Sequence, residues 1–221
     1  MYPSSQSQKS KNNNVIIFDF DGVFADSFDT FYPLIRDGMG SVGFKLSSSQ
    51  YKEFFIGNVH SGYRNFIKDK KKLAAFLKIR KANYDHYYYD AKTKAKLFSE
   101  TGRFIKNVAK KHQLTIASSG YTKNVKALLG NYGSYFSLIL ADSEPKENMI
   151  RKILNKFKAS ARKTIFVTDT VGDIKAAKKM KLKTIAVSWG FQDAKFLKKY
   201  SPNKVVKSFK ELEKALLDLS G

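Results

Sequence analysis

The chain predicts an α/β fold in which buried parallel strands alternate with amphipathic helices. Apolar runs of about four residues, among them 15–18, 114–117 and 184–187, are separated by segments in which apolar residues recur at helical spacing. A long stretch after the first run, from 25 to about 98, has a helical character that no strand pattern interrupts. We therefore expect a Rossmann-like core of parallel strands with right-handed crossovers, and a helical cap inserted after the first strand.

The elements of the core follow one another in a regular order. After the strand at 15–18, the pattern predicts helices at 100–111, 122–129, 147–157 and 173–180, and strands at 114–117, 138–140, 164–167, 184–187 and 205–206. Ser208 and Glu211 have the spacing of a capping box, which predicts the start of a last helix that runs through Leu219.

The cap region predicts helices at 29–37 and 49–55 and two more within 63–89. Glycines separate these segments, and Pro33 falls in the first turn of its helix or bends it. The predicted organisation is a disordered tail at 1–13, a core at 14–28 and 99–221, and a cap at 29–98.

Composition narrows the chemistry. With 221 residues, the chain can form one good-sized core with a smaller insert. It has no cysteine, which excludes disulfides and thiolate chemistry, and its three histidines lack the spacing of a zinc site. Any metal ligands should therefore be oxygens, which favours Mg²⁺. The sequence contains no signal-peptide pattern and no apolar run of about 20 residues, so we expect a soluble, cytoplasmic protein without membrane contact.

The formal net charge of +22 raises the question of a nucleic-acid partner. Nearly all the basic residues are lysines, only six are arginines, and they are distributed over every predicted helix. Base recognition and phosphate forks favour arginine, and no nucleic-acid-binding motif accompanies the charge. We therefore favour a solvated cationic surface over a functional one, although a positive field would help to attract a phosphorylated substrate.

The most informative segment is the first strand and the turn after it. The apolar run ends in Asp19 and Asp21, two residues apart, followed by Gly22. In an open α/β sheet, ligands bind at the carboxyl ends of the strands. Two carboxylates directed at one point are unfavourable unless a cation or a proton lies between them. The segment therefore indicates a metal-assisted reaction.

Four motifs in order along the chain resemble those of the haloacid dehalogenase superfamily. Asp19-Phe20-Asp21-Gly22-Val23 resembles its first motif, Ser118 matches the second, Lys146 is the best match for the third, and Asp169-Thr170-Val171-Gly172-Asp173 resembles the fourth. The region 164–191 is similar to phosphoglycolate-phosphatase-like members. The resemblance covers almost the whole chain after about residue 14.

The resemblance implies a role for each of these residues. Asp19 would be the nucleophile that forms an aspartyl-phosphate, and Asp21 the general acid and then the general base. Asp169 and Asp173 would hold Mg²⁺ together with Asp19 and the backbone region of Asp21. The phosphoryl group would be bound by the remaining groups of the site, which are Lys146, Ser118 and backbone N–H groups near Ser119 and Gly120.

Each assignment has a structural alternative. Ser118 could only cap the following helix, as could Ser119 or Thr122. Lys146 lacks the proline that often follows the motif lysine, and Lys123 is the next candidate for its role. Asp173 could merely favour a helix N-terminus, and Thr168 replaces a glycine common before Asp169. Trp189 is expected to serve in packing.

The second carboxylate and the position of the cap indicate the type of member. Haloacid dehalogenases lack an acid at the position of Asp21, so its presence favours phosphoryl transfer. Ser118 follows Asp19 by 99 residues, which leaves room for a cap between the first and second motifs. Lys146 follows Ser118 by only 28 residues, so the cap is of the helical type inserted after the first motif and closes over the site. Such a lid suits small phosphorylated metabolites. Within it, Arg64 is a candidate substrate contact for a carboxylate or second phosphate, with a structural ion pair as the alternative.

The favoured function is a magnesium-dependent phosphatase that hydrolyses a small-metabolite phosphomonoester through an aspartyl-phosphate, with phosphoglycolate as one candidate. A phosphomutase of the same superfamily is the enzymatic alternative. A non-catalytic, basic nucleic-acid-binding protein is the alternative from another class. A monomer and a homodimer are both compatible with the sequence.

Overall fold

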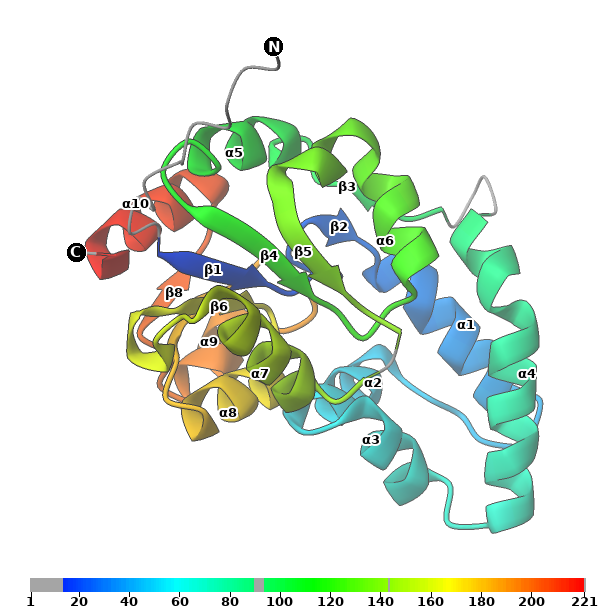
Figure 1. The fold of residues 1–221 in the computed structure, drawn as a ribbon. Helices are drawn as coiled ribbons and strands as arrows, with labels where there is room; N and C mark the ends of the chain where they lie inside the picture. Colours follow the sequence, from blue (N-terminus) through cyan, green and yellow to red (C-terminus); the bar gives the residue numbers. More distant parts are fainter. Residues whose placement is uncertain (1–13, 90–93, 143, 221) are drawn as a thin grey trace.

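A six-stranded parallel sheet forms the centre of this computed structural model, which describes residues 14–89, 94–142 and 144–220 (Figure 1). The strand order is β5-β4-β1-β6-β7-β8, so the first strand lies in the middle of the sheet. The predicted α/β class is therefore confirmed, and the predicted tail at 1–13 lies outside the described residues. The strands are β1 (Val15–Phe18), β4 (Gln113–Ala117), β5 (Phe136–Leu140), β6 (Ile165–Thr168), β7 (Lys183–Val187) and β8 (Lys204–Val206).

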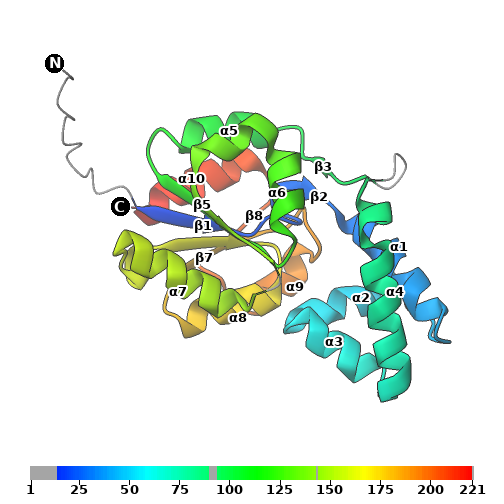
Figure 2. The same ribbon diagram turned by 45° about the vertical axis from the view of Figure 1, so that its right-hand side comes forward.

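Helices cover both faces of this sheet, as the edge-on view shows (Figure 2). One face carries α5 (Thr101–Val108), α6 (Thr122–Leu129) and α10 (Phe209–Ser220), and the other carries α7 (Lys146–Phe157), α8 (Val171–Lys179) and the short α9 (Ala194–Lys198).

Strand β1 shows why the sheet is buried on both sides. Ile16 and Phe18 pack in the cluster under α5 and α10, whereas Val15 and Ile17 pack in the cluster under α7 and α8. Because successive side chains of a strand point to opposite faces, a strand covered on both sides must be apolar at every position. This requirement explains the continuous apolar run that made the strand visible in the sequence.

A second helical group lies beyond the carboxyl ends of the strands (Figure 2). It has its own hydrophobic cluster, which includes Leu34, Met39, Tyr63 and Phe76, and we call it the cap. Its boundaries as a separate domain stay a prediction. Its helices are α1 (Phe28–Gly40), α2 (Ser48–Glu53), α3 (Val59–Phe66) and α4 (Lys70–Tyr89), with a 3₁₀ turn at Phe54–Ile56.

The prediction that no strand interrupts the cap region is wrong. Strands β2 (Ala25–Asp26) and β3 (Lys96–Leu97) pair in antiparallel fashion where the chain leaves and re-enters the core. Strands of two residues are too short to produce a readable alternation, so the sequence pattern could not reveal them.

Other local differences are small. Helix α3 begins before Tyr63 because Asn58 caps it, accepting a hydrogen bond of 2.9 Å from the backbone N–H of His60. Helix α9 and the 3₁₀ turns at Gly130–Tyr135 and Ala161–Lys163 were not predicted. Trp189 packs as expected, with its ring 4.9 Å from that of Phe209. No helix in the described part of the chain is long and apolar enough to cross a membrane.

Candidate active site

Three adjacent strands deliver the predicted motif residues to one edge of the sheet. Phe18 of β1 pairs in register with Ile116 of β4 and Val167 of β6. The chain positions just after these strands therefore meet, and they hold Asp19, Ser118 and Asp169. The backbone N–H of Asp19 continues the ladder with a 2.9 Å hydrogen bond to the Val167 carbonyl.

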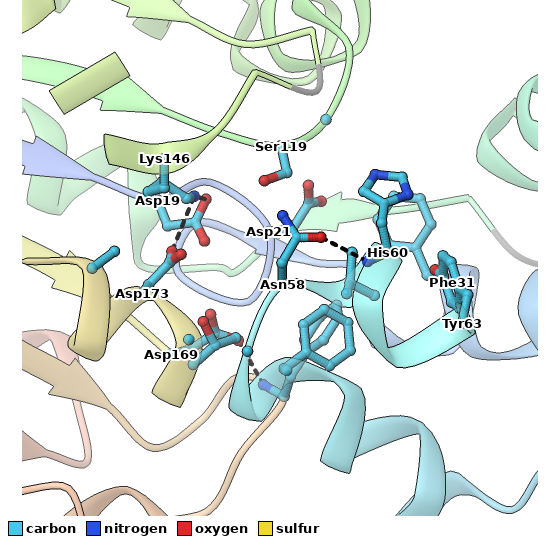
Figure 3. Close-up of a pocket in the computed structure, with 18 of the residues that line it drawn as sticks. Asp19, Asp21, Phe31, Asn58, His60, Tyr63, Ser119, Lys146, Asp169 and Asp173 are labelled. Carbon is cyan, nitrogen blue, oxygen red and sulfur yellow. Dashed lines mark hydrogen bonds and ion pairs between the residues drawn. The ribbon is translucent and has the colours of Figure 1, made fainter. Parts of the chain in front are cut away.

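Lys146 lies at the centre of this edge, at the first position of α7 (Figure 3). Its ammonium group is buried and donates hydrogen bonds to the Ala117 carbonyl and Asp19 Oδ1, both at 2.9 Å, and it lies 3.0 Å from Asp173 Oδ2. Burial opposes the charged form, but the Asp173 and Asp19 carboxylates outweigh it and raise the pKa of Lys146. The alternative lysine, Lys123, is exposed and pairs with Asp85 at 2.8 Å.

The carboxylates outnumber this one ammonium group. Burial, followed by the charge of Asp19, raises the pKa of Asp21 to about 7. The same two causes raise the pKa of Asp169, and burial also raises that of Asp173. Within the described part of the chain, the buried Oδ1 atoms of Asp21 and Asp169 have no hydrogen-bond partner. Unsatisfied buried carboxylate oxygens of this kind indicate space for a cation.

The donor set fits Mg²⁺ in its chemistry. No group of three or more acidic or histidine side chains among the described residues is arranged to hold a metal ion by itself. However, Mg²⁺ is usually bound through one or two carboxylates, together with water and substrate phosphate oxygens. Asp169 and Asp19 provide oxygens of the required type, and the Asp169 Oδ1 atom lacks any other partner among the described residues.

Asp169 is held in a tight cradle of backbone. Its Oδ2 atom accepts a 2.7 Å hydrogen bond from the backbone N–H of Phe191. A Cβ atom at Gly190 would lie 2.5 Å from both the Asp169 Cβ and the Gly22 carbonyl oxygen, and a Cβ atom at Gly22 would overlap the Asp169 carboxylate. Gly22 also has a φ of +74°, which favours glycine. The two glycines therefore serve the placement of one carboxylate.

Thr168, the departure from glycine before Asp169, contributes hydrogen bonds. Its hydroxyl donates to Asp173 Oδ2 and accepts from the Thr170 backbone N–H, both at 3.2 Å. The side chain is fully buried. Thr168 therefore helps to orient Asp173, which lies in the first turn of α8.

The two serines after β4 have different surroundings. Ser118 is buried, does not line the cavity, and accepts a 3.0 Å hydrogen bond from the Gly120 N–H. Ser119 lines the cavity (Figure 3). Helix α6 is capped by Asp142, which accepts hydrogen bonds from the N–H of Thr122 at 2.9 Å and from its hydroxyl at 2.7 Å.

A cavity of about 370 Å³ separates these residues from the cap. This volume lies in the range of small-molecule sites. The core side is polar, whereas the cap side is largely apolar and aromatic, with Phe31, Ile35, Tyr51, Phe55 and Val59 among its lining residues.

The cap arginine selected from the sequence does not reach this cavity. Arg64 is exposed and donates to Ser61 Oγ at 2.8 Å within its own helix. Arg80 of α4 lines the cavity instead. His60 lines it too (Figure 3). The sequence held a signal for Arg80, because it lies four residues after Phe76 and four before Tyr84, on the apolar face of its helix.

Residues 16–187 match the model of the haloacid dehalogenase-like hydrolase family. The chain belongs to this family. The match extends from β1, which Asp19 follows, to β7, and includes all four motifs.

Solved structures of other proteins share the fold of this chain. A predicted phosphatase from Clostridium acetobutylicum aligns with a TM-score of 0.80 at 21% identity, over 93% of this chain and 99% of that one. A haloacid dehalogenase-like hydrolase from Streptococcus pneumoniae aligns at 0.79 with 19% identity, over 92% and 98%. A predicted phosphoglycolate phosphatase from Haemophilus somnus aligns at 0.73 with 18% identity, over 94% and 99%.

A relative of higher sequence similarity is named Probable phosphatase IndB, from Dickeya dadantii. It is 34% identical to this chain over an alignment of 119 positions, which covers 49% of this chain. The chain spans about half the length of that curated relative, 52%.

Proposed function

We propose that the protein is a Mg²⁺-dependent phosphatase that hydrolyses a small phosphomonoester through an aspartyl-phosphate on Asp19. The observation that carries this proposal is the arrangement of Asp19, Asp21 and Lys146 at one end of the cavity. Lys146 contacts the proposed nucleophile directly, and Asp21 has a pKa of about 7, suited to giving and taking a proton. The phosphatase named among the relatives supports the same reaction class.

In the first step, an oxygen of Asp19 attacks phosphorus and the bond to the leaving oxygen breaks. Asp19 Oδ1 is held by Lys146 and by the Phe20 N–H at 2.8 Å, which leaves Oδ2 as the attacking atom. Asp21 gives its proton to the leaving oxygen, so the organic product departs as an alcohol.

In the second step, water hydrolyses the aspartyl-phosphate. Asp21, now a carboxylate, takes a proton from the water as it attacks phosphorus, and Asp19 is released together with inorganic phosphate. Mg²⁺, held by Asp169 and Asp19 with Asp173 nearby, would neutralise charge on the phosphoryl oxygens. Lys146 reduces repulsion among the carboxylates, and N–H groups near Ser119 and Gly120 would donate to the phosphoryl group.

The cavity favours a small substrate under a closed lid, because the cap covers the carboxyl ends of the strands (Figure 2). Phosphoglycolate is one candidate, proposed from the resemblance of residues 164–191. A phosphomutase would use the same carboxylates and would form an isomer in place of free phosphate.

The test is phosphate release from a panel of small phosphate esters, with and without Mg²⁺. We expect Mg²⁺-dependent turnover by the wild type, and a loss of at least about 1,000-fold in Asp19→Asn, because removal of the nucleophile blocks the covalent step. Asp21→Asn should also lose activity, since the amide cannot exchange the proton. Asp218→Asn, which changes an exposed carboxylate of α10, is the matched control and should retain turnover.

Folding of each variant is checked by its thermal unfolding curve. If folded Asp19→Asn kept wild-type turnover, or if Mg²⁺ had no effect on the wild type, the proposal would be wrong. Isomer formation without phosphate release would favour the mutase.

A further inference from the structure

Arg80 is a charged residue of the cavity that the proposed reaction does not use. It lies on α4 in the cap, and its side chain is partly buried. Among the described residues it forms no ion pair, and its buried Nε atom has no hydrogen-bond partner. A guanidinium group that is removed from water and not paired is costly unless a ligand completes its interactions.

The surroundings of Arg80 are tyrosines instead of carboxylates. Its guanidinium carbon lies 5.8 Å from the ring centre of Tyr63 and 5.8 Å from that of Tyr84. Tyr63 also forms a side-chain hydrogen bond with Arg80. These contacts hold the guanidinium in place, while its Nε–H has no partner among the described residues and can donate to an anion. Tyr51 also lines the cavity and is buried.

Tyr84 lies within electrostatic reach of both ends of the cavity. Burial, and after it the charge of Asp21, raises the pKa of Tyr84, whereas Arg80 lowers it. The apolar side chains Phe31 and Ile35 line the same cavity. A molecule that contacts both the carboxylates and Arg80 therefore occupies a cavity that also has an apolar and aromatic lining.

We propose that Arg80 forms a second anion subsite, which selects phosphomonoesters whose organic part carries a carboxylate or second phosphate beyond an apolar spacer. The proposal rests on the proposed phosphatase function and adds the charge of the far end of the substrate. Arginine suits this task because its planar fork can bind a carboxylate or phosphate through two parallel hydrogen bonds.

The test compares matched pairs of esters that differ only in the terminal group. Phosphate release is measured with ω-carboxyalkyl phosphates of two to four carbons, the corresponding bisphosphates, and the uncharged alkyl phosphates of the same lengths. We expect the wild type to favour a charged member by about 10- to 100-fold in kcat/KM, the range for hydrogen bonds to charged groups. The two charged series distinguish a carboxylate from a second phosphate.

Arg80→Met keeps the length of the side chain without its charge, and it should bring this ratio close to one, mainly through KM. Arg80→Lys should give an intermediate ratio, since it keeps the charge and loses the fork. Arg64→Met is the matched control, because Arg64 is an exposed arginine of the same cap that does not line the cavity, and it should keep the wild-type ratio.

The subsite would be ruled out if the wild type favoured no charged ester at any length, or if folded Arg80→Met kept the preference. If the wild type hydrolysed none of the esters, the phosphatase proposal would fail, and the subsite would be judged separately by binding. In that case ω-carboxyalkyl phosphonates should bind the wild type more tightly than alkyl phosphonates, and Arg80→Met should remove the difference. Equal affinity of the wild type for the two phosphonates would overturn the proposed anion subsite.

Discussion

Single side chains in the site are positioned by backbone as much as by other side chains. Asp169 is enclosed by Gly22, Gly190 and the Phe191 N–H, and Thr168 orients Asp173 through its hydroxyl. Close packing of this kind restricts the rotamers of a carboxylate that would otherwise turn toward water. It also makes the site sensitive to changes as small as one methyl group.

The cradle predicts the effect of Gly190→Ala. The added Cβ would lie 2.5 Å from the Gly22 carbonyl oxygen, so the backbone or Asp169 must move. We expect turnover to fall by about 100-fold, as for a displacement of roughly 1 Å at a reacting centre, and stability to fall by about 1–3 kcal/mol. Steady-state kinetics and chemical unfolding measure the two effects.

Gly40→Ala is the control for this substitution. A Cβ at Gly40, at the end of α1, meets no atom within 4 Å, so both activity and stability should stay near those of the wild type. Wild-type turnover in Gly190→Ala would show that Asp169 does not need this cradle.

At the scale of elements, the site depends on how each helix begins after its strand. Lys146 is the first residue of α7 and Asp173 lies in the first turn of α8, so both depend on the helix starts. Helix α6 begins next to Ser119 and is capped by Asp142, which follows β5. A residue that follows the neighbouring strand β5 therefore fixes the end of the loop that carries the proposed phosphate-binding N–H groups.

Asp142 gives a prediction for stability and its dependence on pH. Asp142→Ala should cost about 0.5–2 kcal/mol, the usual range for loss of an N-cap. Hydrogen bonds from the Thr122 backbone and hydroxyl lower the pKa of Asp142 below 3.8. The charge-dependent part of the stabilisation is therefore complete above pH 3.8 and is lost as the pH falls through the folded-state pKa.

The measurement is urea unfolding of the wild type, Asp142→Ala and Asp142→Asn between pH 7 and pH 2. The asparagine variant keeps a capping oxygen that does not titrate, so its difference from the wild type should be constant above pH 3.8 and shrink below it. If the difference in unfolding free energy between Asp142→Asn and the wild type did not change with pH, the charge of Asp142 would not stabilise the start of α6.

At the scale of the whole molecule, the core contacts the cap from both sides of the sheet, and the hydrogen bonds on the α8 side also involve the element that carries Asp173. The buried Gln192 accepts a 2.7 Å hydrogen bond from the Val171 N–H and donates a 2.8 Å hydrogen bond to the Lys52 carbonyl. Lys175 of α8 donates to the Ile56 carbonyl at 3.0 Å. Helix α8 thus carries Asp173 of the site and also contacts the cap, so a movement of the cap can change the position of Asp173.

Gln192→Glu tests this connection. The acceptor for Val171 remains, but the donor to Lys52 is replaced by a carboxylate oxygen that faces a carbonyl. We expect faster amide hydrogen exchange at 48–56 and a rise in KM of about 2- to 10-fold, because one interdomain hydrogen bond is lost. Hydrogen exchange by mass spectrometry and steady-state kinetics measure the two effects.

Lys123→Ala is the matched control for the lid. It removes a contact between α6 and α4, the 2.8 Å pair with Asp85, but this pair is exposed and should contribute little. If amide hydrogen exchange at 48–56 stayed at the wild-type rate in Gln192→Glu, Gln192 would not hold the cap against the core.

The alternation of strands and helices along the chain, the long segment after the first strand and the acidic residues at strand ends were readable from the residues. These features depend on local patterns: an apolar run such as 15–18 must be a doubly covered strand, and a residue at its end must lie at the sheet edge. Asp19 and Asp169 lie at such strand ends, Lys146 was selected through the resemblance of its motif, and the structure brings the three together.

Other features depended on which distant segments meet in the folded chain. Arg80 and Arg64 are both cap arginines, and the packing of α4 against α1 is what brings the former to the cavity. Asp142 caps a helix twenty residues earlier, and Gln192 contacts a carbonyl 140 residues away. Local patterns specify each element because they arise from neighbouring residues, whereas such contacts arise only when the elements pack, and so they could not be read from the sequence.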